Sequence, residues 1–228
     1  MKIAEIYRSI QGEGFLTGTP SAFIRTSGCN LRCWFCDTPY ASWNPEGEDW
    51  SIEQILAEVA ELDCEHVVLT GGEPMLCRPL VQLSRELVAL GHHVTIETAG
   101  TRWLPVACQL MSISPKLSGS LPPASHGRLW QRRHQQRRHR PDVVRRLMDQ
   151  YDYQLKFVID APEDCEEVER YLEELGLVDR SRVLLMPQGT EREALAERAE
   201  WLAEYCRERD LAYCPRRHIE LYGLVRGT

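Results

Sequence analysis

Hydrophobic and polar positions follow two different periods that alternate along the chain. Short apolar runs typical of buried strands occupy six segments, residues 21–26, 66–70, 93–97, 109–113, 154–159 and 182–186. Between them, apolar residues recur every three or four positions, as in amphipathic helices, over residues 52–62, 80–90, 163–175 and 191–209. Strand and helix therefore alternate, and the pattern predicts an α/β protein.

Start and stop signals support these elements. Ser51 and Gln54 have the spacing of a capping box, and Gly91 and Gly176 follow two of the helices as C-terminal stops. A regular alternation of strand and helix implies right-handed crossovers between parallel strands. We therefore expect one domain over residues 1–228, with a sheet that is doubly wound or curled into a barrel or part-barrel.

Composition places the chain among ordinary globular proteins. It has 228 residues, of which 43% are hydrophobic and 27% charged. No apolar run approaches the roughly 18 residues that span a bilayer, and the strand-like residues 2–7 follow Met1 without an apolar signal core. Nine cysteines, an odd number, suit a reducing compartment. We expect a cytoplasmic protein, with six of the nine thiols acting as small buried apolar groups.

Charge is distributed unevenly. The formal net charge is -7, yet residues 126–146 contain eight arginines and one acid, a local +7 that leaves -14 on the rest. This basic stretch, within a predicted insertion at about 121–146, has two interpretations. It is a docking surface for an acidic partner such as a small electron-transfer protein, or a solvated and partly disordered segment. RNA binding is disfavoured because only Trp130 is available for base stacking.

Unusual residues follow five of the predicted strands at the same end. These are three cysteines after the first strand and the segments 70–74, 97–100, 114–116 and 187–189 after later ones. The carboxyl ends of parallel strands meet at one edge of a sheet or barrel, where ligands bind. The sequence therefore predicts a single active site on that rim.

The three cysteines, Cys29, Cys33 and Cys36, have the spacing CxxxCxxC. A structural zinc site takes four protein ligands, and the next cysteine, Cys64, belongs to a different element. A cubane iron–sulfur cluster held by three thiolates keeps one iron open to a ligand that is not protein. The spacing favours such a cluster, with a zinc site or chance thiols as the alternative.

This spacing resembles the signature of the radical S-adenosylmethionine (SAM) superfamily, and GGEP after the next strand resembles the superfamily segment that supports the methionine ammonium. The stretch SIQGEGFLTGTPSAFIRTSGCNLRCWFCDTPY is very similar to the opening of the 7-carboxy-7-deazaguanine synthase family. The later segments TGGEP, IETAGT, SPKLSGS, LMPQGT and RRHIELYGLVRGT resemble that family in the same order. The resemblance covers the whole chain except the arginine-rich stretch. It implies a compact, modified partial (β/α)6 TIM-like barrel of the radical SAM type.

The resemblance also implies a reaction. The family converts 6-carboxy-5,6,7,8-tetrahydropterin to 7-carboxy-7-deazaguanine with loss of ammonia, in queuosine and 7-deazapurine biosynthesis. An electron from a 4Fe-4S cluster cleaves SAM, the resulting radical takes a hydrogen from the substrate, and SAM is regenerated. A magnesium ion bound by the substrate carboxylate assists. A homodimer and a flavodoxin- or ferredoxin-type reductant are implied as partners, with no role for a membrane or nucleic acid.

The resemblance transfers roles to individual residues. Cluster ligands are Cys29, Cys33 and Cys36, and the magnesium ligand is Thr38, with Asp37 acting through water. SAM contacts are Phe35, Gly72, Glu73, Ser114, Lys116 and Gln188. Substrate contacts are Gln11, Gly12, Glu13, Arg25, Thr70, Gly71, Glu97 and His218. One departure is Ala99, where family members often have Asn.

Simpler interpretations stay open for several of these positions. Gln11, Glu13 and Arg25 could be polar residues at strand ends, Asp37 and Thr38 a turn, and a lone His218 structural. At the level of the whole protein, the alternatives are a small radical SAM activase that places a glycyl radical on a partner, and a metal-binding module with an RNA-holding arm.

Overall fold

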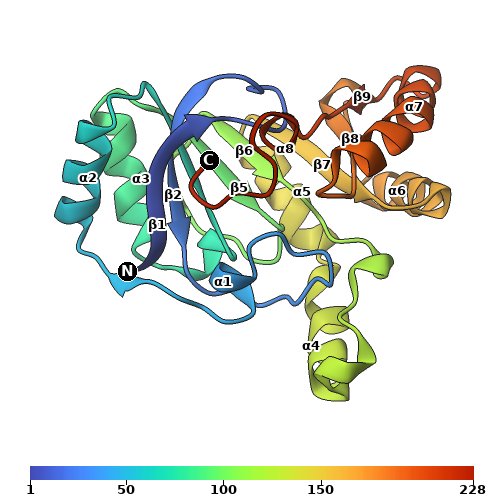
Figure 1. Ribbon diagram of the computed structural model, residues 1–228, viewed down its shortest axis with the longest axis horizontal. Coiled ribbons are helices and arrows are strands. Elements are labelled where there is room, and N and C mark those ends of the chain that lie inside the picture. Colours follow the sequence, from blue (N-terminus) through green and yellow to red (C-terminus); the bar gives the residue numbers. More distant parts are fainter.

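One open β-sheet of nine strands organises residues 1–228 of the computed structural model (Figure 1). The strand order is β3-β1-β2-β4-β5-β6-β7-β8-β9. The strands are β1 (Lys2–Ile10), β2 (Pro20–Thr26), β3 (Glu48–Asp49), β4 (His66–Gly71), β5 (His93–Thr98), β6 (Leu110–Ile113), β7 (Tyr153–Ile159), β8 (Val183–Pro187) and β9 (Ala212–Tyr213). Strand β1 pairs antiparallel with β2 and β3, and every other pair is parallel. The six strands predicted from the sequence are the parallel strands from β2 to β8, in chain order.

Helices connect most of the successive parallel strands, although none lies between β5 and β6 and the last helix follows β9. They are α1 (Pro39–Ser42), α2 (Ile52–Glu61), α3 (Leu80–Ala89), α4 (Arg128–Arg138), α5 (Pro141–Gln150), α6 (Pro162–Leu175), α7 (Arg192–Glu208) and α8 (Arg217–Tyr222). Short 3-10 turns lie at η1 (Pro74–Leu76), η2 (Ser118–Ser120), η3 (Ala124–His126) and η4 (Arg180–Arg182). The predicted capping box is present: Ser51 accepts a hydrogen bond from the amide of Gln54, whose side chain bonds back. None of the helices is both long and apolar enough to cross a membrane.

The two faces of the sheet differ in chemistry because side chains alternate along each strand. In β7, Leu155 and Phe157 pack in the main hydrophobic core together with residues of the helices, whereas Gln154 and Lys156 face the opposite side. The same alternation in β5 places Ile96 in the core and Glu97 on the opposite face. The chain therefore forms the expected partial barrel, apolar under its helices and polar within.

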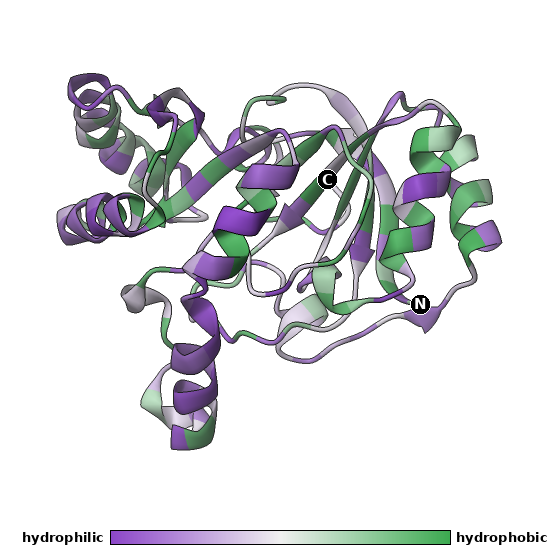
Figure 2. Ribbon diagram, turned by 180° about the vertical axis from the view of Figure 1, so that it is seen from behind, coloured by the Kyte–Doolittle hydropathy of each residue, from purple (hydrophilic) through white to green (hydrophobic).

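The arginine-rich stretch is ordered, so the interpretation of residues 126–146 as partly disordered is wrong. It forms α4 and the first part of α5, and α5 is the crossover helix between β6 and β7. Val143, Val144 and Leu147 of α5 are buried in the core. Arginine is a good helix former, and the arginines around these three apolar positions hide their helical spacing. Only α4 stands away from the sheet, mostly purple in Figure 2.

Most of the six cysteines outside the predicted cluster behave as expected. Cys64, Cys165, Cys206 and Cys214 are buried, while Cys77 and Cys108 are partly buried. All nine are free thiols. Cys64 precedes the amino end of β4, whereas the predicted site lies at the carboxyl ends of the parallel strands.

Candidate active site

A cavity of about 550 Å³ opens on the polar face of the sheet, toward the carboxyl ends of the parallel strands. Strand residues, the loop that contains the three cysteines and the C-terminal segment line it. Of the predicted site residues, all except Gly71 and Glu73 are among its lining: Gln11, Gly12, Glu13, Arg25, Cys29, Cys33, Phe35, Cys36, Asp37, Thr38, Thr70, Gly72, Glu97, Ser114, Lys116, Gln188 and His218. The prediction that one rim gathers these residues is confirmed, while their individual roles stay predictions.

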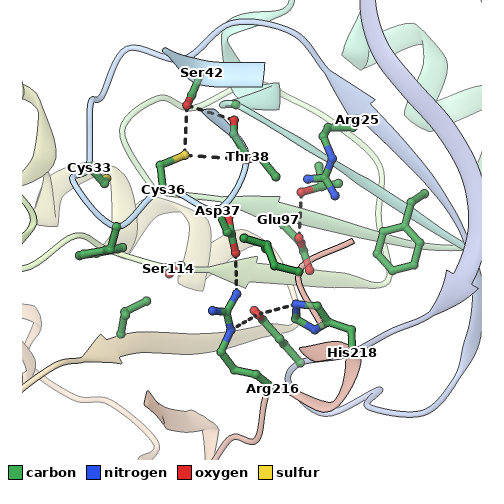
Figure 3. Close-up of a pocket in the computed structure, with 18 of the residues that line it drawn as sticks. Arg25, Cys33, Cys36, Asp37, Thr38, Ser42, Glu97, Ser114, Arg216 and His218 are labelled. Carbon is green, nitrogen blue, oxygen red and sulfur yellow. Dashed lines mark hydrogen bonds and ion pairs between the residues drawn. The ribbon is translucent and has the colours of Figure 1, made fainter. Parts of the chain in front are cut away.

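Three thiols, and none of the other six, line this cavity. Burial raises the pKa of Cys29 and of Cys33 to about 12, so a bound cation is needed to make either a thiolate at neutral pH. The Cys36 Sγ atom lies 3.0 Å from Ser42 Oγ and 3.9 Å from Thr38 Oγ1 (Figure 3). Cys64 lies at the amino end of β4 and does not line the cavity, so the thiols present there fit a cluster held by three cysteines.

The two glycines of GGEP bring two loops together. A Cβ atom on Gly71 would come within 2.3 Å of Thr26 O, and one on Gly72 within 2.2 Å of Gly28 O. The amide of Gly72 donates to Thr26 O at 3.1 Å, and the amide of Glu73 to Gly28 O at 2.9 Å. Having no side chains, the two glycines let the GGEP loop pack directly against the start of the cysteine loop.

Glu73 is only 2% exposed, and both oxygens of its carboxylate accept hydrogen bonds within the protein. It accepts hydrogen bonds from Thr98 Oγ1 at 2.7 Å, from the Ala99 amide at 2.8 Å and from the Met75 amide at 3.1 Å. Burial raises the pKa of Glu73, and the hydrogen bonds, which act to lower that pKa, offset only part of the rise. Glu73 therefore fastens the end of β4 to the end of β5, and Ala99 makes its polar contact there through its backbone.

A hydrogen-bonded set of predicted substrate residues lies on the polar face. Glu97 on β5 accepts from Gln11 Nε2 at 3.1 Å and from Thr70 Oγ1 at 2.8 Å. The Gln11 side-chain oxygen accepts from the amide of Glu13 at 3.2 Å. The QGEG loop is thereby held to the ends of β4 and β5 by side chains that also line the cavity.

Glu13 is the centre of a charged cluster that the sequence did not reveal. The Glu13 carboxylate pairs with Lys156 Nζ, and it lies 3.2 Å from Arg216 Nε and 3.9 Å from His218 Nε2. Burial alone would raise its pKa, but the charges of Lys156 and Arg216 hold that pKa well below its usual value. Glu13 is therefore an ionised acceptor inside the cavity. Lys156 could have been suspected of a special role because it is a lysine within a largely apolar strand, residues 153–159.

Arg216 joins the C-terminal segment to three loops around the cavity. Its Nη2 atom lies 2.5 Å from Asp37 Oδ2, and its Nη1 atom donates to Gly189 O at 2.6 Å. The next amide, that of Arg217, donates to Gly12 O at 2.9 Å. The segment that follows β9 is thus fixed over the polar face, and the Asp37 carboxylate is paired with a guanidinium group. Adjacent arginines in the sequence gave no sign that only the first is buried.

Arg25 is already partnered. Its Nε atom lies 2.6 Å from Glu5 Oε1, and its Nη2 atom donates a hydrogen bond to Tyr7 OH at 2.8 Å. Burial opposes its charge, but Tyr7, Tyr40 and Glu5 together raise its pKa, so it remains a cation. Two parallel hydrogen bonds from Arg25 to a bound carboxylate would therefore use the Nη edge, because Nε is engaged by the protein.

Ser114 and Lys116, two of the predicted SAM residues, contact each other at the cavity wall. Lys116 Nζ donates to Ser114 O and to Ser114 Oγ, both at 2.7 Å. Trp34 is 45% exposed and stacks edge-on against Phe35, with its indole N–H donating to Gly119 O at 2.9 Å. These contacts pack the two aromatic residues against each other and join the cysteine loop to the segment after β6.

Comparison with known proteins agrees with this arrangement. The model of the radical SAM superfamily matches residues 23–116. A 7-carboxy-7-deazaguanine synthase of Rhodopirellula baltica is 46% identical over 99% of this chain and 88% of the relative, and one of Halobacterium salinarum is 44% identical over 98% and 91%. The crystal structure of QueE from Escherichia coli has the same fold, with a TM-score of 0.68 at 24% identity over 95% of this chain and 94% of that one.

Proposed function

Because the chain belongs to the 7-carboxy-7-deazaguanine synthase family of radical SAM enzymes, we propose that it converts 6-carboxy-5,6,7,8-tetrahydropterin to 7-carboxy-7-deazaguanine with release of ammonia. Membership of the family implies a 4Fe-4S cluster and SAM as cofactors. The observation that supports the proposal best is one cavity lined both by the three thiols and by Glu13, Arg25 and Glu97. The two ends of that cavity suit a cofactor and a small polar heterocycle.

Cys29, Cys33 and Cys36 would hold the cluster, with SAM between it and the polar face. When bound, the cluster and SAM supply the radical that removes a hydrogen atom from the substrate. Ser114, Lys116 and Gln188 would contact the nucleoside part of SAM. Glu73 acts through the loop it fastens, because Thr98 and two amides already occupy its carboxylate.

The polar face would orient the pterin. The carboxyl oxygens of Glu13 and Glu97 accept hydrogen bonds, which suits the N–H groups along one edge of a pterin, and Arg25 presents its Nη edge to the substrate carboxylate. Since Lys156 and Arg216 hold Glu13 in place, its oxygens need no rearrangement when the substrate arrives. This is the pre-organisation that lowers the cost of binding.

Magnesium would bind together with the substrate. Thr38 offers one hydroxyl oxygen to the cavity, Asp37 is paired with Arg216, and no three His, Cys, Asp or Glu side chains are arranged to hold one metal ion. Magnesium prefers several oxygen ligands. The substrate carboxylate is needed to complete the set, so magnesium should bind measurably only when the pterin is present.

Residues 1–228 would act as one domain in a cytoplasmic homodimer that receives electrons from a flavodoxin- or ferredoxin-type protein. Free thiols throughout the chain support a reducing compartment. Exposed apolar side chains concentrated near the C-terminus support self-association: Leu221, Tyr222, Leu224 and Val225. Light scattering of the purified protein tests the dimer.

An anaerobic turnover assay tests the function. The cluster-reconstituted protein receives SAM, magnesium, dithionite and 6-carboxy-5,6,7,8-tetrahydropterin, and the deazapurine is followed by absorbance and mass. Product in excess of the SAM supplied would support both the reaction and the reuse of SAM. Consumption of SAM without deazapurine would contradict the proposed substrate.

A further inference from the structure

Helix α4 presents a row of exposed arginines that no acidic side chain neutralises. Arg128, Arg132, Arg133 and Arg137 are all exposed, and none has a carboxylate within ion-pair distance. Elsewhere in the stretch, Arg138 pairs with Glu167 and Arg140 with Asp142. On α5, Arg145 bonds Glu174 O and Arg146 lies over Trp103, contacts that hold the side chains without neutralising their charge. Six arginines of the stretch thus have no carboxylate partner, and four of the six lie on α4.

The helix is attached to the cysteine loop itself. His134 of α4 is fully buried and accepts a hydrogen bond from the backbone amide of Arg32 at 3.0 Å, with its other ring nitrogen 3.0 Å from Ser120 Oγ. Arg137 Nη1 donates to Asn30 O at 3.3 Å. Asn30 and Arg32 lie between the first two cysteines, so α4 is held rigidly beside the segment that would bind the cluster.

We propose that the basic face formed by Arg128, Arg132, Arg133 and Arg137 is the docking surface for a small acidic protein that delivers single electrons to the cluster. The inference rests on the proposed function, which requires a reduced cluster. In each encounter the carrier is oxidised by one electron and the cluster is reduced by one, with no bond made or broken in either protein.

Charge distribution favours an acidic partner at this place. The stretch that includes α4 has a local charge of +7, and the remainder of the chain has -14. An acidic carrier is attracted to α4 and repelled elsewhere, so the field orients it with its contact at the cysteine loop. The exposed Trp34 in that loop and Leu129 on α4 add apolar contact area beside the charges.

Nucleic acid fits the surface less well. Trp130, the aromatic residue of α4, has the Arg32 guanidinium group 4.1 Å from its ring centroid and that of Arg133 at 5.5 Å. Its ring is therefore already engaged by cations and is not free for base stacking, which contributes most to single-strand binding.

Charge reversal tests the surface. Arg128→Glu combined with Arg132→Glu removes two exposed arginines whose side chains form no hydrogen bond or ion pair within the protein. Arg78→Glu combined with Arg207→Glu is the matched control. Arg78 and Arg207 are also exposed and unpartnered but lie before α3 and on α7. Both double variants change the net charge equally. The probe is an acidic flavodoxin, titrated against cluster-reconstituted protein at low ionic strength and followed by FMN fluorescence.

We expect the α4 variant to weaken flavodoxin binding about tenfold, with the difference disappearing at high salt, and the control variant to bind like the wild type. Equal flavodoxin affinity in all three proteins would overturn the proposal. It would also be overturned if the α4 variant lost binding to a single-stranded RNA but kept its affinity for flavodoxin. Turnover with dithionite, which needs no docking surface, should be the same in all three. Absence of product with dithionite in the wild type would contradict the proposed function and leave the binding comparison intact.

Discussion

Gly12 lies against His218 so closely that a Cβ atom on residue 12 would come within 2.0 Å of the imidazole Nδ1. The carbonyl of the same glycine accepts from the Arg217 amide at 2.9 Å. These contacts join the QGEG loop near the N-terminus to the C-terminal segment, and they explain why a glycine is needed at this position: the approach is too close for any side chain.

Gly12→Ala should therefore displace His218 and open the cavity. We expect a rise in KM for the pterin of about tenfold or more, because the substrate residues lose their pre-organised positions. Steady-state kinetics with dithionite measure the effect. Gly119→Ala is the control, since its Cβ would meet only Asp164 Oδ1 at 3.5 Å, an ordinary contact. An unchanged KM in Gly12→Ala would contradict this arrangement of the C-terminal segment.

Lys156→Met should destabilise the protein by about 3 kcal/mol, because it leaves the buried Glu13 carboxylate with less compensating charge. Urea unfolding at neutral pH measures the loss. The double variant with Glu13→Gln removes the uncompensated charge and should recover part of it. If the single variant were as stable as the wild type, Lys156 would not be needed to compensate Glu13.

The same pair predicts a dependence on pH. The pKa of Glu13 in the folded protein lies below its ordinary value of 4.5, so the stability it provides is complete above pH 4.5 and is lost as the pH falls through the lower folded value. Wild-type stability should fall in that acidic range, and Glu13→Gln should flatten the curve. Thermal unfolding between pH 6 and pH 3 supplies the comparison, and parallel curves would argue against it.

His134→Ala should loosen α4 from the cysteine loop. It leaves the buried Arg32 amide without an acceptor, at a cost of about 2 kcal/mol in unfolding free energy, and should lower the iron retained after reconstitution. His134→Asn is the conservative control, because its side-chain oxygen can replace Nδ1 as acceptor. Equal iron content and stability in the wild type and the alanine variant would show that this bond does not support the loop.

Burial, with Arg138 and Lys116 nearby, lowers the pKa of His134 to about 4. The neutral form is thus favoured in the folded state, and its contribution to stability is present above the ordinary pKa of 6.5 and is lost as the pH falls toward 4. The wild type should lose more stability than His134→Asn between these values. Chemical unfolding at several pH values decides the matter.

Alanine at Cys29, Cys33 or Cys36 should abolish turnover and reduce iron and sulfide content, while the fold persists because the three residues lie on a loop. Cys77→Ala, a change outside the cavity, should retain iron. Iron and sulfide analysis with circular dichroism makes the comparison. Full turnover in any of the three loop variants would contradict the cluster assignment.

Local signals predicted a large part of the molecule. The capping box at Ser51, the six parallel strands and four of their helices were visible in spacing alone, because those elements depend on neighbouring residues. Helix α5 was missed, since arginines surround its three buried apolar residues and mask the period. The position of the site followed from topology, as parallel strands place their carboxyl ends at one edge.

The sequence by itself thus determined the order of the elements, the rim on which the chemistry-bearing residues meet and the three thiols of the cysteine loop. Only the tertiary structure decided which charges face one another. Glu13 meets Lys156 across 143 positions and Arg216 across 203, and nothing near Glu13 in the chain indicates either partner. Such pairs depend on the register of distant strands and on the path of the C-terminal segment. Those are fixed by packing over the whole core, so no short stretch of sequence contains them.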